Sequence, residues 1–273
     1  MHSYSGTTAL ITGASKGIGK AYAKQLASRG ANLVLVARST ATLEALASEL
    51  RADHGTHVTV LAADLFDREA PQTIADALTE RHLDIDLLIN NAGMGAVGPF
   101  LTRPYGPNVD SVDLNITALM GLAHVFGARM LERGRGGIIN VASIAGFQPM
   151  PYQASYAATK AFVLSFTEAL AEELRGSTVR VMAVHPGPVE TGFFDGTTAT
   201  LNARSVSPDR IAARSLDDFA RGRTISFPGE VSDRAIAFVS RLLSRKRVAR
   251  LTGNFNRRFG HHKVADLTAP AEA

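Results

Sequence analysis

The chain has 273 residues, of which 45% are hydrophobic and 20% charged, and this composition excludes a disordered or collagen-like protein. There is no cysteine, which excludes disulfides, thiolate metal sites and cysteine nucleophiles and favours a reducing, cytoplasmic setting. The net charge of +4 is small and much of the basic excess lies between Arg241 and Lys263, so we expect no nucleic-acid partner. We also expect no signal peptide and no membrane-spanning segment.

Short, β-branched apolar runs alternate with longer helical patterns along the chain. The predicted strands cover residues 7–12, 32–37, 57–62, 86–90, 137–142 and 178–184. The predicted helices cover residues 17–29, 41–53, 69–81, 109–133, 153–175 and 208–221. This alternation is typical of βαβ units. We therefore predict an α/β fold, a single doubly wound Rossmann-type parallel sheet with helices on both faces.

The C-terminal part predicts a last strand at 221–229, an apolar helix to Leu243 and a basic run. We divide the chain into a dinucleotide-binding and catalytic domain, 1–243, and a basic tail, 244–273. The tail is either a solvated helix end, a contact with the protein body or a second subunit, or a peripheral membrane contact. Membrane contact is not favoured, because Gly253 and Gly260 break the segment. We expect the tail to affect assembly or location and not the chemical step.

A glycine-rich loop follows the first predicted strand. Glycines at 13, 17 and 19 allow a tight turn and a close approach to a pyrophosphate, and the N-terminus of the next helix offers unpaired N–H groups to it. The spacing G-x3-G-x-G differs from G-x-G-x-x-G, so only the mechanism of that fingerprint carries over. A glycine-rich turn without a ligand is the alternative interpretation.

The end of the second predicted strand bears on cofactor choice. NAD sites place an acid there, whereas this chain has Arg38 and no acid before Glu44. Arg38, with Lys16 and Ser15 of the glycine loop, suits the 2′-phosphate of NADP(H). The alternative is that Arg38 and Lys16 are solvated surface charges.

Three further side chains form a candidate catalytic group. Tyr156 and Lys160 are four residues apart on a predicted helix and so share one face. A nearby ammonium favours the phenolate, so Lys160 is expected to lower the pKa of Tyr156. Ser143 follows the strand 137–142 at the edge where ligands bind in parallel sheets, and its hydroxyl can orient a carbonyl oxygen.

Together these motifs resemble the short-chain dehydrogenase/reductase family, classical type, over about residues 7–240. The motifs are T-G-x3-G-x-G, the Asn-Asn-Ala-Gly segment at 90–93, Ser143, Tyr156-x3-Lys160 and the Pro-Gly pair at 186–187. The resemblance implies that Tyr156 is the general acid in reduction and the base in oxidation. It implies that Ser143 binds the substrate oxygen, that Lys160 binds the nicotinamide ribose, and that Asn115 holds a water in a proton relay.

The resemblance also implies a set of cofactor-binding residues. Asp64 would lie near the adenine amino group, Asn91 beside the adenine ribose, and the segment 186–191 at the nicotinamide carboxamide. Asn115 as a core or capping amide and Asp64 as a helix N-cap are the alternatives. The full expected set is Gly13, Ser15, Lys16, Gly17, Ile18, Gly19, Arg38, Asp64, Leu65, Asn91, Ala92, Gly93, Tyr156, Lys160, Pro186, Gly187, Val189 and Thr191.

Several polar residues are expected to take no part in chemistry. His185 is interpreted as structural, Asp84 and Asp86 lie at the start of a strand away from the crevice, and the pair His261-His262 has no third ligand, so we expect no metal.

Apolar loop residues indicate the substrate class. We expect the crevice to be lined by Met94, Phe147, Met150, Pro151, Tyr152, Phe193 and Phe194, which favours an uncharged or lipid-like carbonyl compound or alcohol, although these residues could simply pack the loops. The order of C-terminal elements resembles the branch of acyl-chain and keto-ester reductases. The sequence thus predicts an NADP(H)-dependent oxidoreductase, and the family resemblance implies a homodimer or homotetramer. A nucleotide-sensing regulator without turnover is the alternative. The presence of Ser143, Tyr156 and Lys160 speaks against it, because a sensor needs only the nucleotide cradle.

Overall fold

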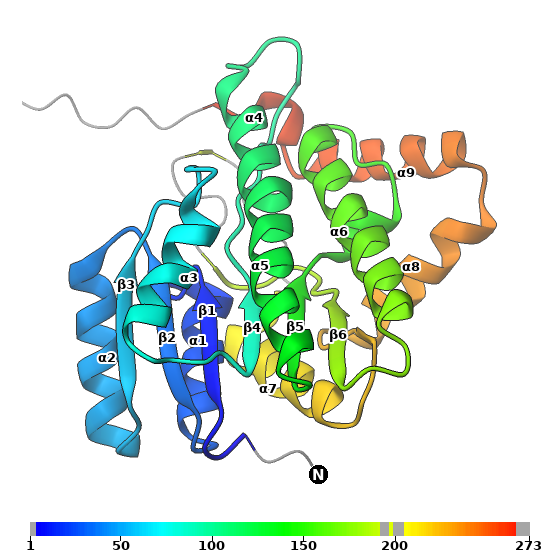
Figure 1. Cartoon of the computed structure of the whole chain (residues 1–273). Helices are drawn as coiled ribbons and strands as arrows, with labels where there is room; N and C mark the ends of the chain where they lie inside the picture. The colour runs from blue at the N-terminus through cyan, green and yellow to red at the C-terminus, as the bar shows by residue number, and fades with distance from the viewer. Residues whose placement is uncertain (1–3, 192–196, 199–204, 266–273) are drawn as a thin grey trace, which may run out of the picture.

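A computed structural model describes residues 4–191, 197–198 and 205–265. Within them a seven-stranded sheet has the order β3-β2-β1-β4-β5-β6-β7, and every neighbouring pair is parallel (Figure 1). The prediction of a doubly wound parallel sheet is confirmed. The strands are β1 Thr8–Thr12, β2 Asn32–Ala37, β3 Val58–Ala62, β4 Leu87–Asn90, β5 Gly136–Val141, β6 Val179–Val184 and β7 Ile225–Ser226.

Helices cover both faces of the sheet. One layer holds α1 (Gly17–Ala27), α2 (Thr40–His54) and α7 (Pro208–Ala220). The other holds α3 (Ala70–Glu80), α5 (Leu119–Glu132) and α6 (Ala154–Glu173). Adjacent strand residues point to opposite faces, so Ile11 joins the core under α1 while Leu10 joins the core under α5. Strands buried on both faces explain the continuous apolar runs of the sequence.

The last strand is much shorter than predicted. Only Ile225 and Ser226 pair with β6, whereas 221–229 was the predicted span. Gly222 has φ +77° and belongs to the turn that ends α7, and Pro228 lacks the N–H that a continuing ladder needs. The prediction for these flanking residues was wrong because turn chemistry overrides the apolar pattern.

The long helix that crosses the sheet differs from the predicted span 109–133. It begins as α4 (Gly106–Val112), passes through a π-helical segment η1 (Asp113–Ala118) and continues as α5. By length and composition it is the one helix among the described residues that could cross a membrane, which we did not expect. In the structure its buried side chains cover the sheet; those of α5 are Leu119, Leu122, Ala123, Phe126 and Met130.

Beyond β7 the chain forms α8 (Val231–Leu242), α9 (Arg245–Arg258) and a short 3-10 helix η4 (His261–Lys263). Helix α9 lies at the upper right of the molecule in Figure 1. The expected break at Gly253 is wrong, because the helix uses this glycine to approach Pro151: a Cβ there would lie 3.2 Å from Pro151 Cγ. Gly260, with φ +77°, does end the helical stretch.

Candidate active site

The glycine loop is a tight cradle between β1 and α1. Gly13 and Gly17 have φ values of +64° and +57°, which other residues rarely adopt. A Cβ at Gly19 would lie 2.2 Å from the Gly13 carbonyl oxygen, so no larger residue fits there. A Cβ at Gly17 would lie 3.0 Å from Thr191 Cγ2, so the loop also adjoins the segment after β6.

Two side chains hold this cradle against β4: Thr12, to which the sequence analysis gave no role, and Asn91. The Thr12 hydroxyl accepts hydrogen bonds from the backbone N–H groups of Asn91 and Ala92, each at 3.0 Å. Asn91 Nδ2 in turn donates to the Thr12 carbonyl at 2.9 Å. The side chain of Asn91, expected beside an adenine ribose, thus fastens the glycine loop. The sequence could have indicated this role for Thr12, because Thr12 is the last residue of the predicted first strand.

Two cations lie beside the cradle. Arg38 is exposed at the end of β2, with its guanidinium carbon 5.9 Å from the centre of the Phe66 ring. Lys16 is exposed and lies at the N-cap of α1, where the helix dipole also attracts anions. Ser15 is half-buried and Ile18 packs against the core beneath the loop. The described residues therefore place two exposed positive charges beside the cradle.

Helix α6 carries Tyr156 and Lys160 on one face, as expected. Lys160 is 5% exposed, and its Nζ donates to the Val141 carbonyl at 2.7 Å. The same Nζ lies 5.9 Å from the centre of the Tyr156 ring. The ammonium thus donates to a carbonyl at the end of β5 and lies near the Tyr156 ring.

The pKa values of the pair differ from the expectation. Burial raises the pKa of Tyr156 to about 12, and a hydrogen bond with the Ser143 side chain opposes this rise. Burial lowers the pKa of Lys160 to about 8. The predicted lowering of the Tyr156 pKa by Lys160 is not found, because burial outweighs it and Lys160 is engaged by Val141. Tyr156 is therefore a protonated phenol at neutral pH.

Ser143 joins this pair from the end of β5. It is 8% exposed and is the N-cap of the 3-10 helix η2 (Ile144–Phe147), where its Oγ accepts from Ala145 N at 3.1 Å. The hydroxyl also donates to the Pro186 carbonyl at 3.5 Å. Ser143 and Tyr156 can therefore contact the same substrate oxygen.

Asn115 lies in the π-helical segment and is fully buried. Its Nδ2 donates to the Met94 carbonyl at 2.8 Å and to Thr159 Oγ1 at 2.9 Å, and its Oδ1 accepts from Met94 N at 2.9 Å. A Cβ at Gly93 would lie 2.9 Å from Asn115 Oδ1 and 3.5 Å from Lys160 Nζ. The amide therefore connects the loop after β4 to the catalytic helix.

The segment after β6 closes the site beside the glycine loop. Pro186 and Val189 are buried, and Val189 pairs with Val206 in an isolated bridge. A Cβ at Gly187 would lie 2.5 Å from the Asp233 carboxylate, so this glycine permits α8 to pack here. Thr191 N donates to the Val189 carbonyl at 2.8 Å. The expected residues Phe193 and Phe194 lie outside the described residues.

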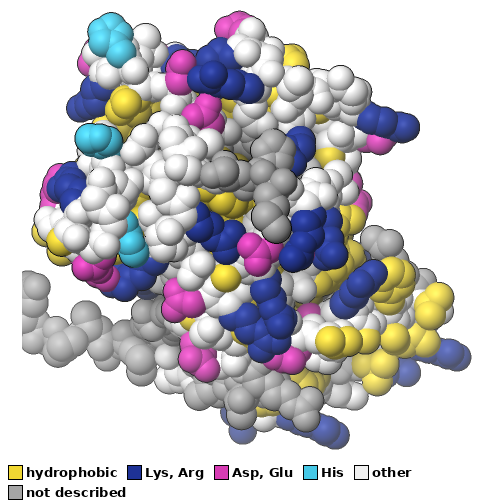
Figure 2. All heavy atoms as spheres, turned by 90° about the horizontal axis from the view of Figure 1, so that it is seen from below, with side chains coloured by type: hydrophobic (Ala, Val, Ile, Leu, Met, Phe, Trp, Pro, Cys, Tyr) yellow, Lys and Arg dark blue, Asp and Glu magenta, His cyan; other side chains and the backbone are white. Residues whose placement is uncertain are grey.

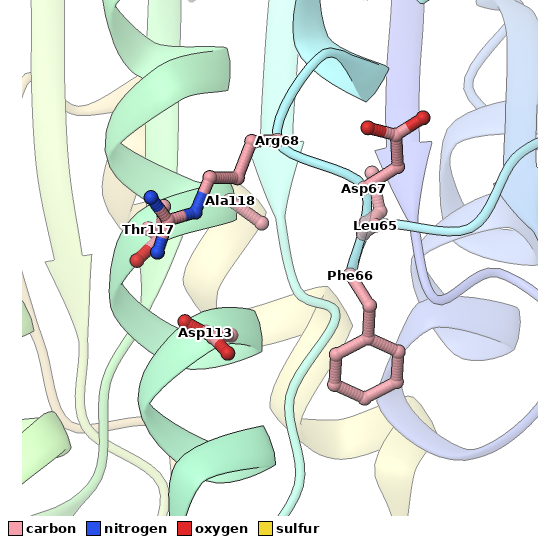
Figure 3. A pocket seen from close by; sticks show the side chains of 7 residues that line it. All are labelled: Leu65, Phe66, Asp67, Arg68, Asp113, Thr117 and Ala118. Atoms are coloured by element: carbon pink, nitrogen blue, oxygen red, sulfur yellow. The ribbon is translucent and has the colours of Figure 1, made fainter.

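Asp64 and Leu65 follow the end of β3. Asp64 Oδ1 accepts from Phe66 N at 3.2 Å in a local turn, and Leu65 is buried. Leu65 and Arg68 border a small hollow with room for about one water molecule, about 10 Å³, against the π-helical segment (Figure 3). Neither Ser143 nor Tyr156 lines it, so this hollow is not the catalytic crevice.

The C-terminal helices hold the loop from η2 to α6, which the sequence analysis expected to line the substrate crevice. Tyr152 has φ +70°, a strained conformation for a tyrosine. Its hydroxyl accepts from Arg257 Nε at 2.6 Å, and Asn256 Nδ2 donates to the Pro151 carbonyl at 2.8 Å. Thr252 Oγ1 donates to the Pro149 carbonyl at 2.8 Å. The expected lining residues Met94, Phe147, Met150, Pro151 and Tyr152 are all half-buried.

The structure also gives the surroundings of the polar residues that were expected to take no part in the chemistry. His185 is fully buried between the rings of Phe147 and Phe227, at 4.8 and 5.2 Å between centroids. Asp84 pairs with Arg133, and Asp86 Oδ2 accepts from Thr8 N, both at the amino edge of the sheet. His261 lies within 3.2 Å of Gln153. No group of metal-ligating side chains occurs in the described part of the chain.

Comparisons with known proteins agree with this geometry. The family model for short chain dehydrogenases matches residues 7–202. A very-long-chain 3-oxoacyl-CoA reductase of Pyrenophora tritici-repentis is 37% identical over 193 residues, which is 69% of this chain and 56% of the reductase. The chain spans about 60% of the length of the first curated relatives it matches.

Solved structures are similar over most of the chain. A short-chain dehydrogenase from Sphingobium yanoikuyae in complex with NADPH has 36% identity and a TM-score of 0.77, covering 86% of this chain and 93% of that one. A short chain dehydrogenase/reductase from Burkholderia phymatum in complex with NAD has 26% identity and a TM-score of 0.79, covering 98% and 100%.

Proposed function

Because the chain belongs to the short-chain dehydrogenase/reductase family of oxidoreductases, we propose that it is an NADP(H)-dependent enzyme that interconverts an apolar carbonyl compound and its alcohol. The observation that carries this proposal is the convergence of Ser143, Tyr156 and Lys160 beside the glycine cradle. The nicotinamide group would supply hydride transfer when bound in that cradle.

The residues present fit a dinucleotide. The Gly19 position has no room for a Cβ, and Gly13 and Gly17 adopt left-handed backbone conformations, so the loop exposes its backbone to a pyrophosphate. Arg38 and Lys16 supply positive charge for a 2′-phosphate, and the β2 end carries no carboxylate that would repel it. The NADPH complex of the Sphingobium relative supports this choice, whereas the Burkholderia relative binds NAD.

In the proposed reaction the protein's own groups handle the proton. Ser143 would donate a hydrogen bond to the substrate carbonyl oxygen and hold it beside the phenol of Tyr156. The raised pKa of Tyr156 keeps its proton in place at neutral pH, so the phenol can protonate the oxygen that gains negative charge during reduction. In the reverse reaction the phenolate of Tyr156 would be the base that accepts the proton of the alcohol. Lys160 would hold the nicotinamide ribose.

The apolar loop residues and the acyl-CoA reductase relative support an apolar substrate. The test is NADPH consumption by the intact chain with a panel of bulky ketones, 3-oxoacyl thioesters and steroid ketones, against a phosphorylated keto sugar as control. We expect turnover of apolar compounds of the panel and no turnover of the phosphorylated keto sugar. NADPH binding without turnover of any member would favour the nucleotide-sensing alternative.

We also propose that the protein is a cytoplasmic homo-oligomer. The exposed side chains Val112, Met120 and Leu131 along α4–α5 support a contact between subunits. Sedimentation velocity of wild type and Met120→Glu tests this, and a monomer in both would contradict it.

A further inference from the structure

Helix α8 carries an apolar stripe that points away from the protein. Val231, Ala235, Phe238, Val239 and Leu242 follow the spacing i, i+4, i+7, i+8 and i+11, which places them on one face of a helix. All five are exposed, with Val231 at 86%, Phe238 at 57% and Leu242 at 84%. We call these five side chains the α8 stripe. Figure 2 shows hydrophobic side chains gathered over α8 at the right-hand edge of the molecule.

The opposite face of α8 is fixed to the protein body. Asp233 and Ala237 are buried, and Asp233 accepts from Glu230 N at 2.9 Å in a capping box at the start of the helix. Ser240 Oγ donates a hydrogen bond to the Phe147 carbonyl oxygen at 3.3 Å. Because this face is anchored, the helix cannot turn to bury its stripe. In an ordinary surface helix the apolar residues face inward, so the orientation of α8 is reversed.

Positive charge follows the stripe along the chain. Residues 231–263 contain nine Lys and Arg and one Asp, whereas the whole chain has 29 Lys and Arg against 25 Asp and Glu, so the remainder is net acidic. Arg245, Lys246, Arg247 and Arg250 follow the end of the stripe and are exposed. In the described part of the chain none of these four has an ion-pair partner. Arg234 lies over the Phe238 ring at 6.0 Å.

We propose that the α8 stripe and the adjoining cations of α9 dock the protein on an anionic lipid bilayer. Apolar side chains of such a helix enter the boundary between headgroups and acyl chains, and the cations bind the anionic headgroups. A second copy fits this surface less well. A two-fold contact through α8 would bring like charges against each other, because both partners present the same basic surface.

The test is co-sedimentation of the intact chain with vesicles of phosphatidylcholine alone and of phosphatidylcholine with 30 mol% (about one third) phosphatidylglycerol. Binding is expected only to the anionic vesicles and is expected to fall steeply in about 1 M salt, where charges are screened within about 3 Å. The Phe238→Ser/Leu242→Ser variant should bind at least about tenfold more weakly. Arg245→Glu/Arg247→Glu should reduce binding by a similar factor.

The matched control is Phe100→Ser/Leu101→Ser, which removes the same residue types at exposed positions (47% and 91%) on the loop before α4. It should bind like wild type. The proposal is overturned if wild type stays in the supernatant with anionic vesicles, or if the α8 variant binds as wild type does. It is also overturned if the α8 variant instead sediments as a smaller oligomer without vesicles, since a second copy would then cover the stripe. The assay measures vesicle binding and requires no turnover, so its result does not depend on whether the proposed enzymatic function is correct.

Discussion

Replacing Lys160 by Met should make the protein more stable while removing a residue of the proposed mechanism. Lys160 is 5% exposed, and burial lowers its pKa from 10.5 to about 8. The folded state therefore releases this proton near pH 8, whereas the unfolded chain keeps it until about 10.5. Between these values the unfolded state binds more protons, so the free energy of unfolding rises with pH by up to about 1.4 kcal/mol per pH unit.

Below pH 8 the penalty for the buried charge is complete, at about 3 kcal/mol. Lys160→Met removes this penalty but also removes the hydrogen bond to the Val141 carbonyl, which costs about 1–2 kcal/mol. The variant should therefore be about 1–2 kcal/mol more stable than wild type at pH 7. It should also lose most of the rise in stability between pH 8 and 9.5.

The measurement is urea unfolding at pH 7, 8, 9 and 9.5 followed by far-UV circular dichroism, since the chain has no tryptophan. The upper limit avoids titration of tyrosines, whose raised pKa values reverse the sign above pH 10. Lys246→Met, at an exposed position of α9, is the control and should keep the wild-type slope. An unchanged slope in Lys160→Met, or a loss of more than about 2 kcal/mol at pH 7, would refute the reasoning.

Three other predictions follow from the site. Arg38→Asp should weaken NADPH at least about tenfold more than NADH, because it replaces a phosphate-binding cation by an anion; equal wild-type binding of both nucleotides in fluorescence titrations would contradict this. Gly19→Ala places a Cβ 2.2 Å from the Gly13 oxygen. The free energy of unfolding, measured with urea, should therefore fall by about 1–3 kcal/mol, and NADPH binding should be lost. Asn256→Ala frees the Pro151 carbonyl, so KM for a bulky ketone should rise several-fold with the NADPH Kd unchanged. The exposed Asn254→Ala is its control, and an equal KM in both variants would remove the role assigned to α9.

Much of the fold could be predicted because its signals are local. The span 32–37 matches β2 residue for residue, since a parallel strand buried on both faces reads as a continuous apolar run. Tyr156 and Lys160 could be assigned to one face from helical spacing alone. The glycine loop was recognisable because its residues must turn tightly within a few positions.

Features that depend on distant contacts could not be predicted. Asn256 donates a hydrogen bond to the Pro151 carbonyl, 105 positions away in the sequence. No pattern in either segment predicts this contact. The same is true of Gly253, which a propensity argument treats as a helix breaker but which packs against Pro151. The pKa of Tyr156 was misjudged because spacing gives the neighbour, Lys160, and not the burial that dominates it.

The central claim is that Tyr156 supplies the proton for carbonyl reduction. The most direct measurement is the turnover of Tyr156→Phe with NADPH and whichever ketone of the panel wild type reduces fastest, with the NADPH Kd determined on the same preparation. Phe keeps the ring and removes the hydroxyl that Ser143 contacts. We predict that kcat falls by about 10²–10⁴ while the Kd changes less than about threefold. A variant that keeps wild-type turnover would contradict the account, because the proton would then come from another group.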